Sequence, residues 1–524
     1  MIPNPFPKTT SIDGYPTPTS IEQQQTEHIL AAHRPAAHGQ ANYDDGNNSS
    51  GNVNDDSGTK SGGNGGGTSS NRPTLHRNLH LQWLARNFSQ GFPPRFVSQD
   101  ASQPWLFFWT IQSFTALGAE LDPVNRQRCI DTIMACQHPE GGFGGGPGQF
   151  PHLLPTYAAI SALSIVGRPG PNGGWDQVNR EKLYSFFLSL KQPDGSFLVS
   201  KDSEVDIRGI YCLLCVATIL NLLTPELIAG TARFIKSLQT YEGGFASASH
   251  PYYASSTSGE DSLLDYPRPA MGEAHGGYTY CALASWVMLR PLIDVDSEKS
   301  GRAPLEIDVK NLTRWLVNMQ GNRNELGGFR GRTNKLVDAC YGWWVGGCFP
   351  LMRALGVGGL YHQHQHHSGS NHVETANEAQ GDDEEWTDLD DELFDRTGLQ
   401  EYLLYAAQHP MGGLRDKPPK PADSYHTLYS LSGLSTAQHN VSPSQELKDK
   451  LLAEWKPLGD GVNPSLEKIK RTAYIEARSW KEDEGSSVYV GGAGNRVNAT
   501  HPVFNLTITH MLYTLTHKPL KNLV

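Results

Sequence analysis

The chain has 524 residues and a formal net charge of −11, so it is too long for one ordinary core, and its acidity excludes general attraction to nucleic acid. Its seven cysteines are few and odd in number, so we expect a reducing compartment and no disulfide framework. The N-terminus lacks the apolar stretch of a signal peptide, and no segment approaches the roughly 18 apolar residues that span a bilayer. We therefore expect a cytoplasmic protein.

Residues 1–75 are rich in Gly, Ser, Asn and Pro. Such a composition buries too little apolar surface to offset the entropy of ordering the chain. We predict a disordered, low-complexity tail over 1–75 and a folded domain over 76–524.

A repeated pattern fills the rest of the chain: an apolar segment of helical length, a Gln, and a turn with Gly-Gly-Phe or a close variant. Polar insertions near 246–272 and 361–392 lengthen two of the intervals, and subtracting about 30 residues from each restores a period of roughly 50. Strand-type alternation is scarce. The pattern predicts an all-α fold, an α/α toroid in which a closed double ring of helical hairpins needs no capping ends. The turns end at Phe143, Phe197, Phe245, Phe329 and Leu414.

Two segments combine a carboxylate, a thiol and an imidazole. Asp338 and Cys340 lie in GGFRGRTNKLVDACYGWW, and His426 lies in DSYHTLYSLSG. Gly328 precedes Cys340 by 12 residues and Gly413 precedes His426 by 13, so the segments should occupy equivalent places on adjacent inner helices. Three such ligands leave a fourth position free, which is typical of catalytic rather than structural zinc. The alternative is a cysteine that simply packs in the core.

Cationic and hydroxyl side chains surround this pattern. Arg332 and Lys335 precede it, Tyr341 follows it, and EAHGGYTYC places His275 and Tyr278 on one face of a helix's first turn. A helix N-terminus beside His275 suits diphosphate oxygens. A helix cap with a packed tyrosine is the alternative, but the combination favours an anion site.

Aromatic residues recur near the starts of the candidate inner helices. They could simply fill a core, but their position near the polar residues indicates an aromatic-walled funnel for an apolar chain. We interpret the Cys212-x-x-Cys215 pair as packing, and the acidic run from Asp388 to Asp391, which a terpene cyclase would need in a core, as part of a polar insertion. The aromatic residues are Trp105, Trp109, Tyr157, Tyr211, Tyr278, Trp343, Trp344 and Tyr425.

Over roughly residues 80–520 the chain resembles the β subunit of protein farnesyltransferases. Seven blocks carry the resemblance in order: DASQPWLFFW, EGGFGGGPGQFPHLLPTYAA, DIRGIYC, EAHGGYTYCALA, GGFRGRTNKLVDACYGWW, GGLRDKPPKPADSYHTLYSLSGLS and HPVFN. The long tail and the two insertions are not part of this shared pattern. No single Gly-Gly-Phe turn would carry the resemblance, whereas seven collinear blocks do.

The resemblance implies a role for each site residue. Asp338, Cys340 and His426 match zinc ligands, with Tyr341 beside them in the catalytic set, and Asp416 matches a magnesium ligand. The residues that match the farnesyl diphosphate site are His275, Gly276, Gly277, Tyr278, Arg332, Lys335, Tyr341, Trp344, Arg208, Tyr211 and Cys281. The residues that match the acceptor-peptide site are Trp105, Trp109, His152, Pro155 and Tyr425.

The implied function is that of the catalytic β subunit in a heterodimer with a helical α subunit. Such an enzyme transfers farnesyl from farnesyl diphosphate to the cysteine thiol of C-terminal CaaX motifs, and zinc deprotonates that thiol. The close alternative is the β subunit of geranylgeranyltransferase type I, from which the bulk of Trp105 should distinguish this chain. A non-catalytic helical ring that binds a protein partner is the alternative of a different class.

Overall fold

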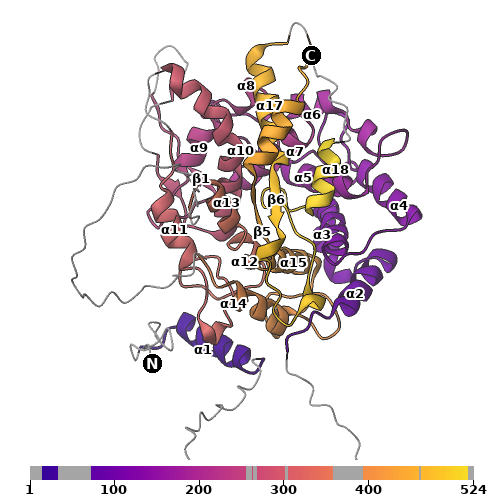
Figure 1. Ribbon diagram of the computed structural model, residues 1–524, viewed down its shortest axis with the longest axis vertical. Helices are drawn as coiled ribbons and strands as arrows, with labels where there is room; N and C mark the ends of the chain where they lie inside the picture. The colour runs from indigo at the N-terminus through magenta and orange to yellow at the C-terminus, as the bar shows by residue number, and fades with distance from the viewer. Residues whose placement is uncertain are drawn as a thin grey trace, which may run out of the picture.

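The computed structural model describes residues 15–33, 72–254, 262–263, 268–300, 305–357, 393–459 and 462–516, and these are mostly helical (Figure 1). The polar insertion near 361–392, with its histidines and the acidic run from Asp388, lies outside the described residues. So do residues 1–14 and 34–71 of the predicted tail.

Six helices of the described chain form an inner ring in which each packs against the next. The last of them, α15, packs against the first, α3, and this contact closes the ring. The predicted α/α toroid is confirmed. The inner helices are α3 (Gln103–Ala116), α5 (Leu153–Val166), α7 (Ile207–Ile219), α10 (Gly276–Ser300), α12 (Tyr341–Trp344) and α15 (Ser424–Gln438).

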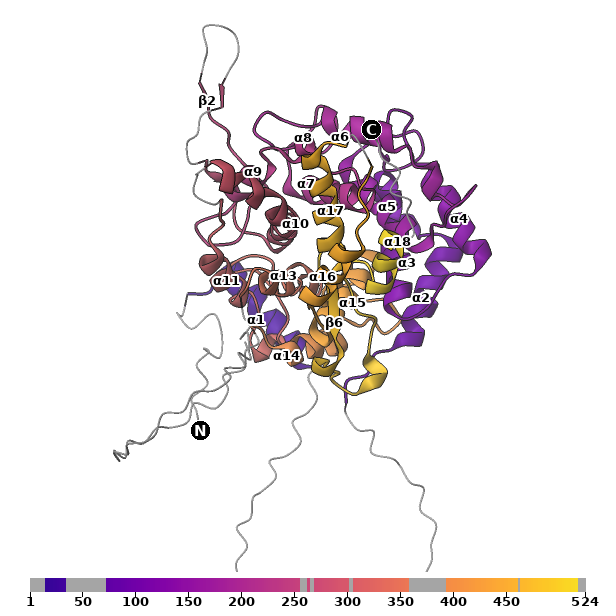
Figure 2. The same ribbon diagram turned by 45° about the horizontal axis from the view of Figure 1, so that its top comes forward.

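An outer helix precedes each inner one along the chain, as the repeat predicts (Figure 2). Inner helices such as α5 are apolar on all sides because both of their faces are covered. The outer helices are α2 (Arg77–Gln90), α4 (Pro123–Met134), α6 (Arg180–Ser189), α9 (Thr231–Ser237), α11 (Val309–Val317) and α14 (Arg396–Glu401). Shorter helices are α8 (Pro225–Ile228), α13 (Cys348–Ala354) and the π-helical η4 (Tyr402–Ala407).

The glutamines of the repeat connect each turn to the next outer helix. Each Oε1 accepts the backbone N–H of the residue that caps that helix, over 2.7–2.9 Å. In the second turn Lys191 takes this place, and its Nζ donates to the carbonyls of Leu227 and Ala229. The glutamines and their partners are Gln137 with Asn179, Gln239 with Asp308, Gln320 with Asp395, and Gln408 with His76.

The glycines of these turns allow the close approach. Gly243 has a φ of 111°, and a Cβ atom there would lie 2.2 Å from the carbonyl oxygen of Asn311 in α11. Because any side chain would force the turn away from the outer helix, the glycine keeps the glutamine within reach of its partner.

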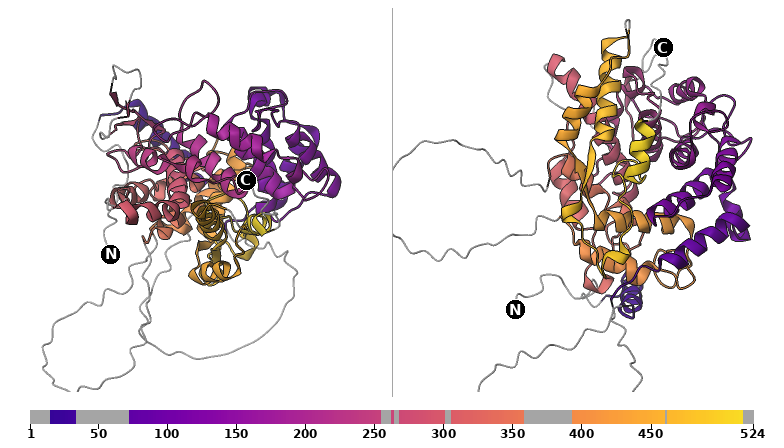
Figure 3. Two further views of the ribbon diagram at one scale, coloured as in Figure 1. Left: turned by 90° about the horizontal axis from the view of Figure 1, so that it is seen from above. Right: turned by 45° about the vertical axis from the view of Figure 1, so that its right-hand side comes forward.

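The C-terminal part of the chain covers one end of the ring (Figure 3). Backbone carbonyls of Pro502, Val503 and Phe504 accept hydrogen bonds from the hydroxyls of Tyr280, Tyr211 and Tyr157, which come from three inner helices. We call residues 501–505 the plug. Around it lie the strand pair β5 (Asn440–Pro443) and β6 (Trp480–Asp483) and helices α16 (Gln445–Glu454), α17 (Pro464–Arg478) and α18 (Ile508–Thr516).

A helix within the predicted tail packs on the ring. In α1 (Pro18–Ala31) the buried residues Gln23, Thr26 and Leu30 share one face, and Gln23 Nε2 donates to Glu325 Oε1 over 2.9 Å. The same buried carboxylate pairs with Arg330 Nη2 at 2.7 Å. The expectation of disorder is therefore wrong for residues 15–33, because the composition of the whole tail concealed one short helix that begins with a capping box and a proline.

The first insertion contributes short strands rather than helix. Strand β1 (Ala248–Ser249) pairs with β4 (Ala270–Met271), and β2 (Tyr253–Ala254) pairs with β3 (Ser262–Leu263). Arg268 anchors the insertion by a buried ion pair with Asp194, at 2.7 Å. Among the described helices, none has both the length and the hydropathy needed to cross a membrane.

Replacing Gln408 with Ala tests the contact that joins the last repeat to the first. The side-chain amide of Gln408 donates to the carbonyl of Thr74 and accepts the N–H of His76. It also accepts a hydrogen bond from the ring of His80, which is neutral because burial lowers the pKa of His80 to about 4. Loss of these buried partners should lower the free energy of unfolding by about 3 kcal/mol in denaturant titrations. Gln445→Ala, at an exposed position of α16, is the control and should change stability little. Equal stability of the two variants would contradict this role.

Candidate active site

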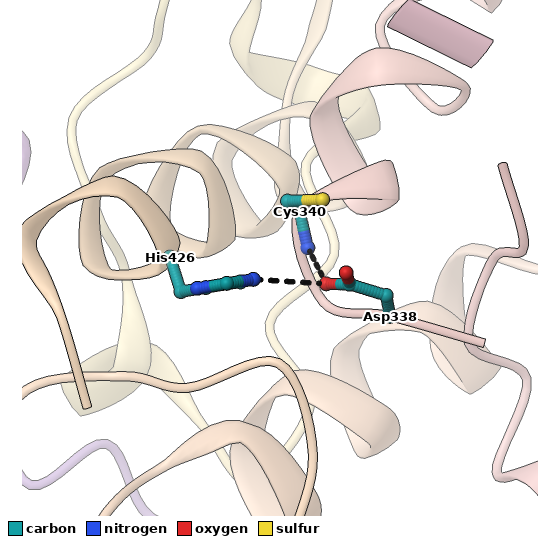
Figure 4. A group of neighbouring side chains, drawn as sticks. All are labelled: Asp338, Cys340 and His426. Carbon is teal, nitrogen blue, oxygen red and sulfur yellow. Dashed lines mark hydrogen bonds and ion pairs between the residues drawn. The ribbon is translucent and has the colours of Figure 1, made fainter. Parts of the chain in front are cut away.

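Asp338, Cys340 and His426 converge at the junction of two adjacent inner helices (Figure 4). Cys340 caps the N-terminus of α12, and His426 lies in the first turn of α15. The candidate ligand atoms of the three residues all lie within 4.8 Å of one another, and His426 Nε2 is 3.4 Å from Asp338 Oδ1. The convergence expected from the repeat spacing is therefore present, and the three side chains can hold one metal ion.

Hydrogen bonds from neighbouring groups orient these side chains. The backbone N–H of Cys340 donates to Asp338 Oδ1 over 2.9 Å. Asp423 caps α15, and its Oδ2 lies 2.6 Å from Nδ1 of His426. Because Nδ1 donates to this carboxylate, Nε2 is the nitrogen available to a metal.

Without metal, the surroundings of His426 and Cys340 raise the pKa of both side chains. Burial opposes a charge on His426, but hydrogen bonds and attraction from Asp338 and Asp423 outweigh it and raise its pKa to about 10. Burial, with Asp338 beside it, raises the pKa of the Cys340 thiol well above its usual range. Both groups therefore carry protons before metal enters, and metal binding must release protons.

An aromatic cavity of about 400 Å³ lies beside the triad. Its volume and its mostly apolar wall suit an elongated apolar ligand with a few polar contacts. Tyr425 connects the cavity to the triad, because its ring lies 5.0 Å from that of His426. The lining residues are Ser102, Trp105, Trp109, Leu154, Tyr157, Arg208, Tyr211, Cys212, His275, Gly277, Tyr278, Cys281, Tyr341, Trp343, Trp344, Tyr425, Tyr429 and Asn505.

His275 and Tyr341 form a hydrogen-bonded pair in the cavity wall. The N–H of Gly277 donates to His275 Nδ1 over 3.0 Å, and burial, assisted by Arg332, lowers the pKa of His275 to about 4. The neutral ring therefore carries its proton on Nε2, which lies 3.2 Å from the hydroxyl oxygen of Tyr341. Since that oxygen accepts from His275, the tyrosine O–H remains free to donate to an anion. Gly331 leaves room for this ring, because a Cβ there would lie 1.9 Å from Cζ of Tyr341.

The three cationic side chains predicted for the diphosphate site differ in their distance from the cavity wall and in their exposure to solvent. Arg208 lines it and is held by the carboxylate of Asp206, at 2.6 Å, with its guanidinium over the ring of Tyr278. Arg332 pairs with Glu273 at 2.6 Å, where both side chains are about half exposed, and Lys335 is exposed. Neither Arg332 nor Lys335 lines the cavity, so an anion between them and Tyr341 would be open to solvent on one side.

Asp416 lies next to the triad but is already paired. Its backbone oxygen accepts the N–H of Ala339, and its side chain lies 2.6 Å from Lys417 Nζ. Burial and the nearby Asp338 raise its pKa, although Lys417 opposes the shift. A cation at this carboxylate would have to compete with the lysine.

The cavity gathers many of the predicted substrate residues, but not all of them. Neither His152, which caps α5 through the N–H of Leu154, nor Pro155, which is buried within that helix, lines the cavity. Gly276 also lies outside the lining, packed against Tyr341. Cys212, interpreted from sequence as packing alone, is both buried and part of the wall.

Sequence reasoning missed Asp423 and four residues of the cavity wall, which are Ser102, Leu154, Tyr429 and Asn505. Asp423 was identifiable as an N-cap three residues before His426, and Tyr429 as the aromatic residue one turn after Tyr425. Asn505 comes from the plug, and no local signal pointed to its place in the wall.

Comparisons with known proteins agree with this architecture. A sequence profile described as the Prenyltransferase alpha-alpha toroid domain matches residues 75–506. The protein farnesyltransferase subunit beta of Arabidopsis thaliana is 36% identical over 405 residues, which cover 70% of this chain and 73% of that protein. The geranylgeranyl transferase type-1 subunit beta of the same organism is 26% identical over 72% of this chain and 88% of its own length.

A solved structure supports the fold alone. The Candida albicans protein geranylgeranyltransferase-I complexed with GGPP superposes with a TM-score of 0.55 at 17% identity, covering 85% of this chain and 99% of the solved one. The fold and the profile thus define a prenyltransferase of the α/α-toroid class. Within that class, the chain belongs to the protein farnesyltransferase β subunits.

Replacing Asp423 with Asn tests the orientation of His426. Asn also caps helices, so α15 should persist, but its neutral amide supports the Nδ1 proton less well. We expect affinity for a divalent metal to fall about tenfold in competition with a chromophoric chelator. Asp122→Asn changes an exposed N-cap of α4 and is the matched control. Unchanged metal affinity in the Asp423 variant would contradict the orienting role.

Proposed function

We propose that this chain is the catalytic subunit that transfers farnesyl from farnesyl diphosphate to the cysteine thiol of C-terminal CaaX motifs in other proteins. The observation that carries the proposal is the Asp338–Cys340–His426 triad beside an aromatic cavity of about 400 Å³. Metal ligands and an apolar cavity are both needed when a thiol must react with an isoprenoid. The family membership supports the same conclusion.

We propose zinc as the metal. A carboxylate, a thiolate and an imidazole within 4.8 Å of one another form a donor set that zinc accepts, with a position left for an exogenous ligand. A zinc ion held there would supply a Lewis acid that keeps the acceptor thiol deprotonated near neutral pH.

The chain's own residues would stabilise the leaving group. The acceptor sulfur forms its bond to C1 of the farnesyl chain while the C1–O bond breaks, and the electron pair leaves with diphosphate. Tyr341 donates to the developing negative charge, and His275 supports it from behind through its Nε2 proton. Arg332 and Lys335 would neutralise the outer oxygens, once Arg332 exchanges Glu273 for the substrate.

Further partners belong to the same proposal. An α subunit would complete a heterodimer, and magnesium at Asp416 would assist diphosphate departure by displacing Lys417. Gly276, Gly277, Tyr278, Trp344, Arg208, Tyr211 and Cys281 would contact the isoprenoid diphosphate. The acceptor peptide would contact Trp105, Trp109, His152, Pro155 and Tyr425. Trp105 and Trp109 would also limit the length of the isoprenoid. A cytoplasmic location fits the seven free cysteines.

The length of the donor should depend on aromatic bulk in the cavity. Trp105 lines it and packs against Tyr157 and Trp109, with ring centroids 5.6 and 5.5 Å apart. These large rings favour the fifteen-carbon donor over the twenty-carbon donor of the geranylgeranyl enzymes.

Replacing Cys340 with Ala tests the metal and the reaction together. In the full chain combined with an α subunit, zinc, magnesium, labelled farnesyl diphosphate and a CaaX peptide, we expect the variant to lose bound zinc and at least 100-fold in rate, because one of three ligands is removed. Cys129→Ala, another buried cysteine outside the triad, is the matched control and should keep one zinc per chain. A non-catalytic helical ring would show neither tight zinc nor thioether product in the unaltered chain.

Truncating Trp105 to Thr tests the length argument. The space released in the cavity should shift the ratio of kcat/KM for geranylgeranyl over farnesyl diphosphate upward by about tenfold or more, since each extra buried methylene contributes about 0.8 kcal/mol. Competition between the two labelled donors measures this ratio directly. If selectivity stays the same while the variant remains folded and active, the steric argument is wrong.

A further inference from the structure

A second, much smaller cavity lies between the ring and the C-terminal helices, outside the site described above. It measures about 30 Å³, and its wall combines Arg180 at the start of α6, Asn221 just after α7, Lys470 and Tyr474 of α17, and Leu515 of α18. Figure 2 shows α17 beside α7 at this point.

Three hydrogen-bond donors in this wall lack acceptors among the described residues. Lys470 is only 3% exposed, and its ammonium group has no hydrogen bond or ion pair there. Arg180 Nε and Asn221 Nδ2 are buried without partners as well. The other end of the Arg180 guanidinium is engaged, because it donates to the carbonyl of Leu220 at the end of α7. Buried donors of this kind ordinarily have partners, so Arg180 Nε and Asn221 Nδ2, with the unpaired Lys470 ammonium beside them, indicate a missing acceptor.

The two cationic side chains in this wall also indicate a missing anion. Burial lowers the pKa of Lys470, and Arg180 lowers it further, with no carboxylate acting in opposition. Burying one unpaired cation is costly, and placing a second cation beside it adds repulsion. A bound negative charge would remove both costs and accept the three free N–H groups at once.

We propose that this cavity binds a small monovalent anion of the size of chloride. At about 30 Å³ the cavity is less than a tenth of the aromatic cavity of about 400 Å³, which favours a small anion. Lys470 and Arg180 supply the charge, and Asn221 supplies a neutral donor. Apolar neighbours such as Leu223 and Ala473 keep the site partly dry, which strengthens the attraction.

The position of the site gives the anion a structural role. It lies where α17 meets the inner ring, and the ring of His501 in the plug donates to the carbonyl of Ala477 at the end of the same helix. The plug in turn accepts from Tyr157, Tyr211 and Tyr280 of three inner helices. An anion that holds α17 on the ring thereby stabilises the segment that closes one end of the isoprenoid cavity.

Thermal unfolding of the full chain, co-expressed with an α subunit, tests the proposal. Sodium chloride is exchanged against sodium gluconate, so that ionic strength and cation stay constant while a small anion is replaced by a bulky one. We expect Tm to rise by a few degrees with chloride and to saturate, as binding to the folded state alone requires. Bromide should replace chloride, and its anomalous signal in crystals should lie within hydrogen-bond distance of Lys470 Nζ.

Lys470→Met keeps the length of the side chain and removes its charge, so it should abolish the specific response to chloride. The variant can be as stable as the parent or more so, and for that reason the response, not the absolute Tm, is the readout. Lys468→Met, at an exposed position of the same helix, should retain the full response. Equal Tm curves in chloride and gluconate for the parent chain, or a water molecule without bromide signal in the cavity, would overturn the proposal. These outcomes are independent of farnesyl transfer.

Discussion

Closure of the helical ring at a fixed register is the constraint on which the rest of this structure depends. In four of the five turns a glutamine side chain accepts the backbone N–H that caps the next outer helix, and Gln408 in this way joins the last repeat to the first. Because the repeats are in register, equivalent positions of neighbouring repeats face the same interior. That is how Asp338 and Cys340 come to lie beside His426, more than eighty residues later in the chain.

The closed ring also places an apolar cavity next to a polar, metal-binding region. Aromatic side chains from several inner helices make an apolar cavity, which the plug closes at one end. The triad, the His275–Tyr341 pair and the surrounding cations lie beside this cavity, where charge can develop near metal and water. An isoprenoid diphosphate has the same division, an apolar chain with an anionic end, and the proposed function follows from this match.

The sequence predicted the toroid and the convergence of the triad because both depend on spacing, which can be read directly from the chain. It did not predict helix α1, since the buried face of that helix is mostly polar and resembles the rest of the tail in composition. It also missed the place of Asn505 in the cavity wall, which depends on a tertiary contact between the C-terminal segment and the ring. The contact of α1 with the ring is tertiary in the same sense, because Gln23 Nε2 reaches Glu325 across some 300 residues of chain.

The central claim is that Asp338, Cys340 and His426 hold one zinc ion with a position open to an incoming thiol. X-ray absorption at the zinc edge of the assembled enzyme tests it most directly. One sulfur at about 2.3 Å is expected without acceptor, from Cys340, and two sulfurs after a CaaX peptide is added. An unchanged sulfur count on peptide addition, or a zinc shell without sulfur, would contradict the account.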